Sequence, residues 1–166
     1  MSDRPKLSIA PTPAERALQG VTMIGIAALF AFCASVWSRL PAKVPTHFDL
    51  SGRPDAWGDR ATLLALPILV VLFYVGFSFL ERLPHTYNYP VPVNANNARR
   101  LYGLGRQLVL TMKLIVTGTF GYIFYNSVQV ALGERVVLSL WFLPVVVVAI
   151  LTSLAVAIVK MSRAAR

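Results

Sequence analysis

The chain has 166 residues, of which 56% are hydrophobic and 14% are charged, and its formal net charge is +9. Soluble domains contain about a quarter of charged residues, so this composition argues against a soluble enzyme or binding domain and indicates a membrane protein. The positive charge does not indicate nucleic-acid binding, because the basic residues flank apolar runs and do not gather on one face. Cys33 is the single cysteine, which excludes an intrachain disulfide.

The first sixteen residues are polar and contain three prolines, and we expect residues 1–16 to form a flexible tail. The next run, 17–38, has no charged residue and is long enough to cross a bilayer as a helix. A secretory signal peptide is the alternative, but its apolar core would be shorter and would end at a small-residue cleavage site. This run continues through Val36 and Trp37, so we predict a retained transmembrane helix.

Further apolar runs predict three more spans. They are expected at 61–80, 108–132 and 136–159. Pro67 would fall in the second turn of its span and Pro144 within the last span, where each can bend the helix. An amphipathic stretch from Ala98 leads into the third span, and residues 83–97 before it are proline-rich and expected to be extended. The sequence therefore predicts an all-α integral membrane bundle of four transmembrane helices, and the continuous apolar runs argue against a β-barrel.

The distribution of basic residues predicts the orientation of the bundle. Four spans place both termini and the middle connection on one side, which carries Arg4, Lys6, Arg16, Arg82, Arg99, Arg100, Arg106, Lys160, Arg163 and Arg166. The other side carries fewer, namely Arg39, Lys43, Arg53, Arg60 and Arg135. The positive-inside rule then places both termini in the cytoplasm, and we expect a multi-pass protein of the bacterial cytoplasmic membrane.

The connection 40–60 between the first two spans is polar, aromatic and rich in proline and glycine. Its aromatic residues argue against disorder, and its prolines and glycines favour tight turns, so we predict an ordered, compact extracytoplasmic loop. We expect its residues to form a rigid recognition surface for a peptide, a protein or an envelope lipid. The candidate binding residues are Pro45, His47, Phe48, Gly52, Pro54, Asp55, Trp57 and Gly58.

His47 shares this loop with Asp49, Asp55 and Asp59, and a histidine with carboxylates can bind a metal or perform acid–base catalysis. An envelope enzyme that uses His47 is therefore one alternative function. The structural alternative is favoured, because aspartates in such loops more often form turns, and Asp59 or Thr62 can cap the second span. We predict no metal site, no cofactor and no enzymatic activity, since no recognised catalytic motif is present.

Lys113 interrupts the third span, and no acidic residue lies within any predicted span. The absence of an acid argues against a transporter, although a transporter or an accessory subunit of one remains an alternative. For Lys113 we favour an ammonium group that extends to the nearby cytoplasmic surface over a functional lysine.

Small residues recur four positions apart in three spans and predict the faces on which the helices pack against one another. They are Ala27, Ala31 and Ser35; Thr117 and Gly121; and Ala149, Ser153 and Ala157.

The loop resembles the DUF1648 family of bacterial membrane proteins. The shared pattern is Leu40-Pro41, then Val44-Pro45-Thr46-His47-Phe48, and then Gly52-Arg53-Pro54-Asp55-Ala56-Trp57-Gly58. A second similarity covers Tyr87-Asn88-Tyr89-Pro90-Val91, Asn97-Ala98 and Lys113. Some members join this domain to helices that resemble SdpI, an immunity and signalling protein that counters a secreted toxin. The resemblance supports the predicted fold and loop, and for function it implies immunity or signalling. From the residues themselves we expect a non-enzymatic binding component, with membrane lipid, a peptide or protein at the outer face and a second copy of the chain as candidate partners.

Overall fold

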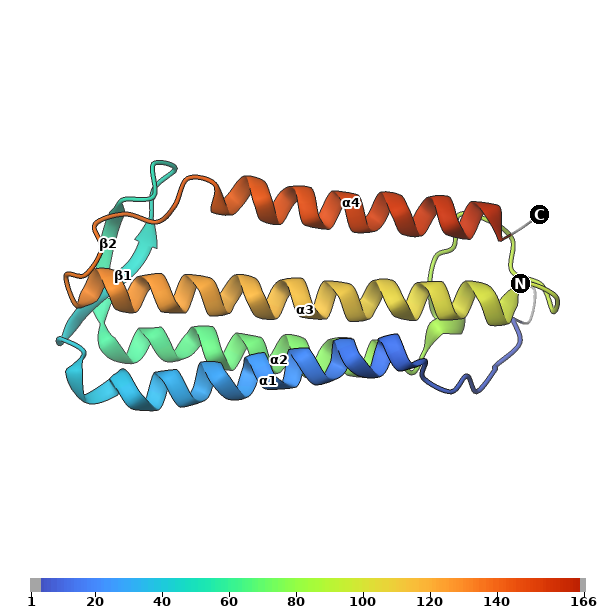
Figure 1. Cartoon of the computed structure of the whole chain (residues 1–166), viewed down its shortest axis with the longest axis horizontal. Coiled ribbons are helices and arrows are strands. Elements are labelled where there is room, and N and C mark those ends of the chain that lie inside the picture. The colour runs from blue at the N-terminus through green and yellow to red at the C-terminus, as the bar shows by residue number, and fades with distance from the viewer. Residues whose placement is uncertain (1–3, 165–166) are drawn as a thin grey trace.

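The computed structural model describes residues 4–164, and four long helices dominate it. They are α1 (Pro13–Val36), α2 (Ala65–Leu80), α3 (Ala98–Ala131) and α4 (Phe142–Arg163). In Figure 1 the four helices run side by side, with both termini at one end and a small β-hairpin at the other. All 4 are long and apolar enough to cross a membrane, so the predicted fold class is confirmed.

Local capping chemistry explains why the helices begin where they do. Thr12 and Glu15 form a reciprocal capping box and Pro13 occupies the first turn, so α1 begins before the uncharged run. Before α2, the Asp59 side chain accepts a hydrogen bond from the Ala61 N–H (2.8 Å), which starts the short 3₁₀ helix η2 (Arg60–Leu64). Asp59 is therefore the cap that the sequence predicted.

Both prolines lie nearer the start of their helices than the sequence predicted. Pro67 is the third residue of α2 and Pro144 is the third residue of α4, because α4 begins at Phe142 and not at 136. Prolines in the first turn lie where backbone N–H groups lack intrahelical partners, so they interrupt no helical hydrogen bond. As predicted, the amphipathic stretch from Ala98 runs into the third span, and together they form the single 34-residue helix α3.

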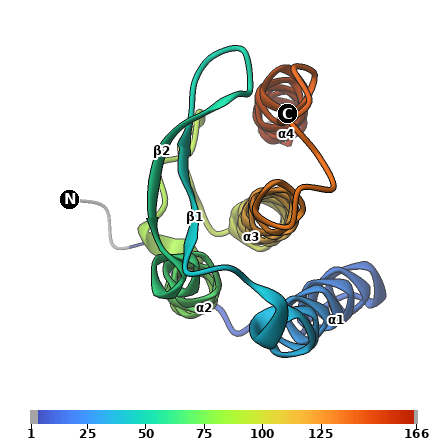
Figure 2. The ribbon, with the colours of Figure 1, turned by 90° about the vertical axis from the view of Figure 1, so that its left-hand side faces the viewer.

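Helix α3 is the central element of the bundle, and α1, α2 and α4 each pack against it. Figure 2 shows this arrangement from the hairpin end, with α4 on the side of α3 opposite to α1 and α2. One apolar core lies near the hairpin and includes Leu29, Val44, Leu63 and Phe124. A second core joins α3 to α4 near the termini and includes Leu101, Tyr102, Ala157 and Met161.

The predicted small-residue faces are correct for α4 and wrong for α1. Ser153 is partly buried and Ala157 is buried, so this stripe of α4 faces its neighbour, whereas Ala27, Ala31 and Ser35 are exposed. Helix α1 turns a different stripe inward, formed by Thr22, Leu29, Cys33 and Val36. On α3, Thr117 is buried, and its methyl group would lie 3.7 Å from a Cβ added at Gly25 of α1.

The compact loop predicted at 40–60 is an antiparallel β-hairpin. Strand β1 (Lys43–Phe48) pairs with β2 (Pro54–Asp59), with Lys43 opposite Asp59 and irregularities between Pro45 and Phe48. The strands escaped prediction because proline and glycine are depleted from strands, yet both occur here. Near α1, the short helix η1 (Trp37–Arg39) connects the first span to this hairpin.

At the opposite end, the segment before α1 is held against the bundle and is not a free tail. The Arg4 guanidinium donates hydrogen bonds to the Tyr87 carbonyl (2.6 Å) and the His85 carbonyl (3.3 Å). These acceptors follow α2, in the connection that contains the 3₁₀ helix η3 (Pro84–Thr86). The first three residues of the predicted tail, and Arg166 of the basic C-terminus, lie outside the described residues.

Two tyrosines of this connection pack closely on α3 at Gly105. The Tyr87 hydroxyl donates to the Leu80 carbonyl (2.7 Å), and the Tyr89 hydroxyl donates to the Pro84 carbonyl (2.8 Å). Burial raises the pKa of Tyr87 to about 12, with a smaller contribution from the charge of Glu81. Both phenols therefore remain neutral hydrogen-bond donors at physiological pH.

A methyl group at Gly105 should disturb this packing. A Cβ there would lie 2.8 Å from both Tyr87 Cδ2 and the Tyr89 hydroxyl oxygen, so Gly105→Ala should destabilise the bundle by about 1–3 kcal/mol. Gly103→Ala is the matched control, because nothing lies within 4 Å of a Cβ at that position of the same helix. Unfolding in mixed detergent micelles measures both variants, and equal stability would contradict the close packing.

Candidate functional site

The hairpin brings together three of the predicted binding residues on one exposed surface. His47 Nδ1 and Asp55 Oδ1 lie 2.6 Å apart, and their side chains are 68% and 46% exposed. Trp57 lies two positions after Asp55 on β2 and is 52% exposed. We call His47, Asp55 and Trp57 the hairpin surface.

The turn of the hairpin is fixed by Asp49 and Gly52. Asp49 Oδ1 accepts hydrogen bonds from the Ser51 hydroxyl (2.6 Å), the Ser51 N–H (2.8 Å) and the Arg53 N–H (2.9 Å). The Ser51 hydroxyl and these backbone donors hold the pKa of Asp49 below its ordinary value. Gly52 adopts a φ of 76°, and its carbonyl accepts from the Leu138 N–H (2.7 Å), which ties the turn to the connection before α4.

The remaining predicted binding residues are buried or partly buried in the hairpin. Pro45 is buried, Phe48 is partly buried, and Pro54 opens β2. Gly58 does not adopt a positive φ; it pairs with Val44 in the sheet, and a Cβ there would lie 2.8 Å from a methyl group of Thr46. These residues are structural supports of the hairpin surface.

A cavity of about 340 Å³ lies between the hairpin and the start of α4. Its lining includes His47, Phe48 and Gly52 from the hairpin, and Leu138 and Phe142 from the opposite wall. Most of these groups are apolar, so the cavity suits an apolar side chain or acyl group.

His47 and Asp55 are close enough for acid–base chemistry, because such partners must lie within hydrogen-bond reach. The pair is solvent-exposed, however. Among the described residues, the Asp55 carboxylate contacts the His47 ring and does not accept hydrogen bonds from the backbone of a turn. Among residues 4–164, no group of three or more metal-ligating side chains is assembled.

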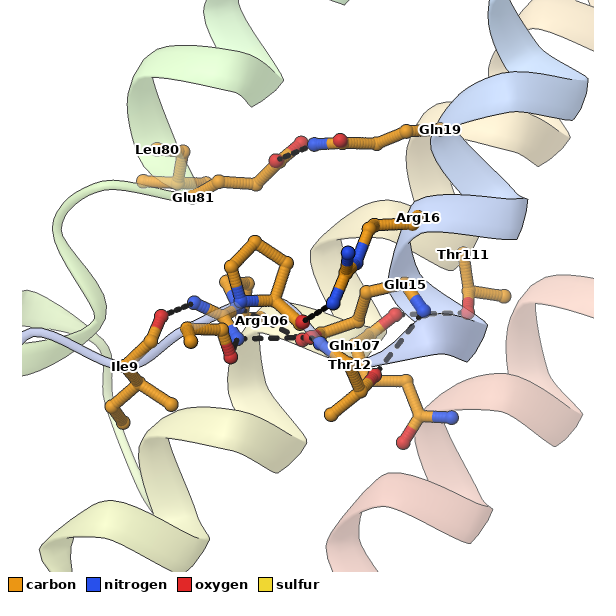
Figure 3. Close-up of polar contacts among 12 residues, drawn as sticks. Ile9, Thr12, Glu15, Arg16, Gln19, Leu80, Glu81, Arg106, Gln107 and Thr111 are labelled. Atoms are coloured by element: carbon orange, nitrogen blue, oxygen red, sulfur yellow. Dashed lines mark hydrogen bonds and ion pairs between the residues drawn. The ribbon is translucent and has the colours of Figure 1, made fainter.

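A second polar site, which the sequence analysis missed, lies at the end of the bundle near the termini. Arg106 of α3 donates to both carboxylate oxygens of Glu15 on α1, from Nε (2.8 Å) and from Nη2 (2.9 Å). It also donates to the carbonyl of Ile9 (2.6 Å), as Figure 3 shows. One guanidinium therefore joins α1, α3 and the segment that precedes α1.

Lys113 belongs to the same site and does not extend to a surface. Its side chain is 1% exposed, forms an ion pair with Glu81 and donates to the Ser78 hydroxyl (2.9 Å). Its ammonium also lies 4.4 Å from the centre of the Tyr74 ring. The preferred explanation of Lys113 is therefore wrong: Glu81, which ends α2, is the acid that the predicted spans lacked.

Gln19 links the Lys113 pair to α1. Its amide nitrogen donates to Glu81 Oε2 (2.9 Å), a contact drawn in Figure 3. We call Glu15, Gln19, Glu81, Arg106 and Lys113 the polar cluster. Because α1, α2 and α3 all contribute side chains, the polar cluster fixes the positions of these helices relative to one another along the bundle axis.

The polar cluster borders a cavity of about 430 Å³. The cavity is lined by residues of α1, α2 and α3 and of the segment before α1, which contributes Leu7, Ser8, Ile9 and Pro11. Charged groups of both signs face it, which distinguishes it from the apolar cavity beside the hairpin.

The sequence offered only a partial signal for this cluster. Lys113 interrupts an apolar run, but Glu15 lies within the predicted tail and Glu81 follows directly after the predicted span 61–80. Arg106 and Glu15 are separated by 91 positions, so no local pattern reports their contact.

Comparisons with known proteins match the hairpin region to a family. The family model of DUF1648, described as a domain of unknown function, matches residues 24–71. An uncharacterized protein of Archaeoglobus fulgidus is 29% identical over 160 residues, which covers 86% of this chain and 87% of that protein. No solved structure matches the chain. Since this relative is archaeal, the comparisons do not restrict the chain to bacteria.

Removal of the Lys113 charge tests how much its ion pair with Glu81 stabilises the bundle. Lys113→Leu leaves the Glu81 carboxylate buried without its cation and should destabilise the bundle by about 3–5 kcal/mol. The double variant Lys113→Leu/Glu81→Leu should recover most of this loss, because neither charge then remains. Detergent unfolding of the two single variants and the double variant gives the coupling energy.

Lys160→Leu is the control, because Lys160 is exposed near the end of α4. Additive effects of the Lys113 and Glu81 substitutions would contradict the ion pair.

Proposed function

We propose that this chain, whose four helices are long and apolar enough to cross a membrane and whose residues 24–71 match the DUF1648 family model, is a non-enzymatic binding component of the cytoplasmic membrane. In this proposal the hairpin surface captures an extended segment of a peptide or secreted protein. The observation that carries it is an ordered two-stranded sheet whose outer strand, β2, is largely exposed.

The geometry of the sheet supports binding of an extended chain. In Figure 2, β1 lies between β2 and α3, so β2 forms the outward edge. No third strand pairs with either edge within the described residues. An unpaired strand edge presents backbone N–H and C=O groups that an extended peptide can match by adding a strand.

The side chains around this edge suit a binding surface. Trp57 supplies a large, rigid contact area, and aromatic residues of this kind dominate the binding energy of many interfaces. The exposed His47 and Asp55 pair supplies polar contacts beside it. Gly52 and Asp49 fix the turn, so little conformational entropy is lost on binding.

Orientation supports an extracytoplasmic ligand. The end of the bundle that holds the termini carries more basic residues than the hairpin end, which favours a cytoplasmic location for the termini. The hairpin surface would then face the outside of the cell. A role in immunity or signalling follows from this proposal if the captured peptide is a secreted toxin, as the likeness to SdpI-containing proteins implies.

A linear-peptide display library, selected against the full chain in nanodiscs, tests the proposal. Trp57→Ala should weaken binding of an enriched peptide by about tenfold, which corresponds to about 1.4 kcal/mol. Trp141→Ala is the control, because Trp141 is 77% exposed but lies outside the hairpin. If the selection enriches nothing over empty nanodiscs, or if both variants bind equally well, the proposal is wrong.

The same peptide distinguishes strand addition from side-chain capture. N-methylation of alternate amides removes hydrogen-bond donors from one edge of the peptide. If the peptide adds a strand to β2, one of the two methylation patterns should abolish binding in fluorescence anisotropy and the other should not. Equal binding of both methylated forms would exclude strand addition.

A further inference from the structure

The cavity beside the polar cluster is not used by the proposed peptide binding, since it lies at the other end of the bundle. We infer that this cavity binds the headgroup of a phospholipid that carries a phosphate and a primary ammonium, the chemistry of phosphatidylethanolamine. Its volume of about 430 Å³ lies within the range of small-molecule sites.

The charges that face the cavity select a zwitterion. Two carboxylates, Glu15 and Glu81, and two guanidinium groups, Arg82 and Arg106, line it. Glu15 is paired with Arg106 and Glu81 with Lys113, whereas the exposed Arg82 can bind a phosphate and the Glu81 oxygen that accepts from Gln19 can accept a further hydrogen bond from an ammonium. A headgroup that carries both charges can place each one beside its opposite.

Glu81 and Arg82 have unused bonding capacity. Glu81 holds Gln19 and Lys113, whereas a carboxylate can accept about four hydrogen bonds. The Arg82 side chain is exposed and makes no ion pair or hydrogen bond within residues 4–164. Because the two residues are adjacent at the end of α2, they can accept an ammonium and a neighbouring phosphate from one ligand.

The other residues with charge in the lining are already committed. Arg106 uses four hydrogen bonds to hold Glu15 and the carbonyls of Ile9 and Ala10. The buried Lys113 holds the Glu81 carboxylate in place through their ion pair. These contacts make the ammonium acceptor rigid before a ligand arrives, which reduces the entropy lost on binding.

The position of the cavity favours a lipid over a soluble zwitterion. It lies where α2 ends, at the level where apolar helix gives way to polar chain, and Leu7, Ile9 and Leu110 add apolar walls. Nearby on α2, Phe79 is 65% exposed and Leu80 is 38% exposed, so acyl chains have an apolar surface to follow. Basic pockets between transmembrane helices are known as sites for lipid headgroups.

Native mass spectrometry of the full chain tests this inference, with dioleoyl-phosphatidylethanolamine, -phosphatidylcholine and -phosphatidylglycerol at equal mole fractions. The ethanolamine lipid should be retained about tenfold more than the other two, because choline has no N–H to donate to Glu81 and glycerol carries no positive charge. Arg82→Gln should reduce this retention by about tenfold, which is the contribution of one charge-assisted hydrogen bond.

Arg99→Gln is the matched control, since Arg99 is also exposed near the termini but does not line the cavity. Thermal unfolding checks that both variants are folded. Equal retention of the three lipids, or equal effects of the two arginine substitutions, would overturn the inference. If soluble phosphoethanolamine protected the chain from thermal unfolding as strongly as the lipid does, the ligand of the cavity would not be a lipid.

Discussion

The ion pair between Lys113 and Glu81 is the interaction on which the arrangement of the helices depends. In lipid, burial of apolar side chains gives no net drive for helix association, so polar contacts and close packing must hold the bundle together. A buried ammonium needs its counter-ion, which fixes the end of α2 against the middle of α3. Gln19 of α1 donates a hydrogen bond to the same Glu81 carboxylate. Closer to the termini, Arg106 of α3 forms a second ion pair, with Glu15 of α1.

The two ends of the molecule have different chemistry because the membrane-spanning middle is apolar. At one end, a stiff hairpin presents Trp57 beside an exposed histidine and carboxylate pair. At the other end, charges of both signs surround a cavity that the segment before α1 helps to close. Figure 1 shows the full length of the helices between them, so binding at one end makes no direct contact with the other.

Much of the fold could be predicted from the sequence, because continuous apolar runs report membrane spans directly. The helix ends could not, since a capping box at Thr12 extends α1 and the first-turn position of Pro144 delays α4. The order of the loop was predicted from its aromatic residues, but its strands were hidden by prolines that are rare in sheets. The polar cluster could not be predicted, because its members lie far apart along the chain and meet only when the helices pack.

The central claim is that the hairpin surface and the polar cluster face opposite sides of the membrane, with the hairpin outside. Single-cysteine labelling of intact cells with an impermeant maleimide tests it, in a Cys33→Ala background because Cys33 is the single natural cysteine. The account predicts that Leu50→Cys, at the exposed hairpin turn, is labelled at once and that Lys6→Cys is labelled only after the membrane is permeabilised. Labelling of both positions from the same side, or of Lys6→Cys alone in intact cells, would contradict it.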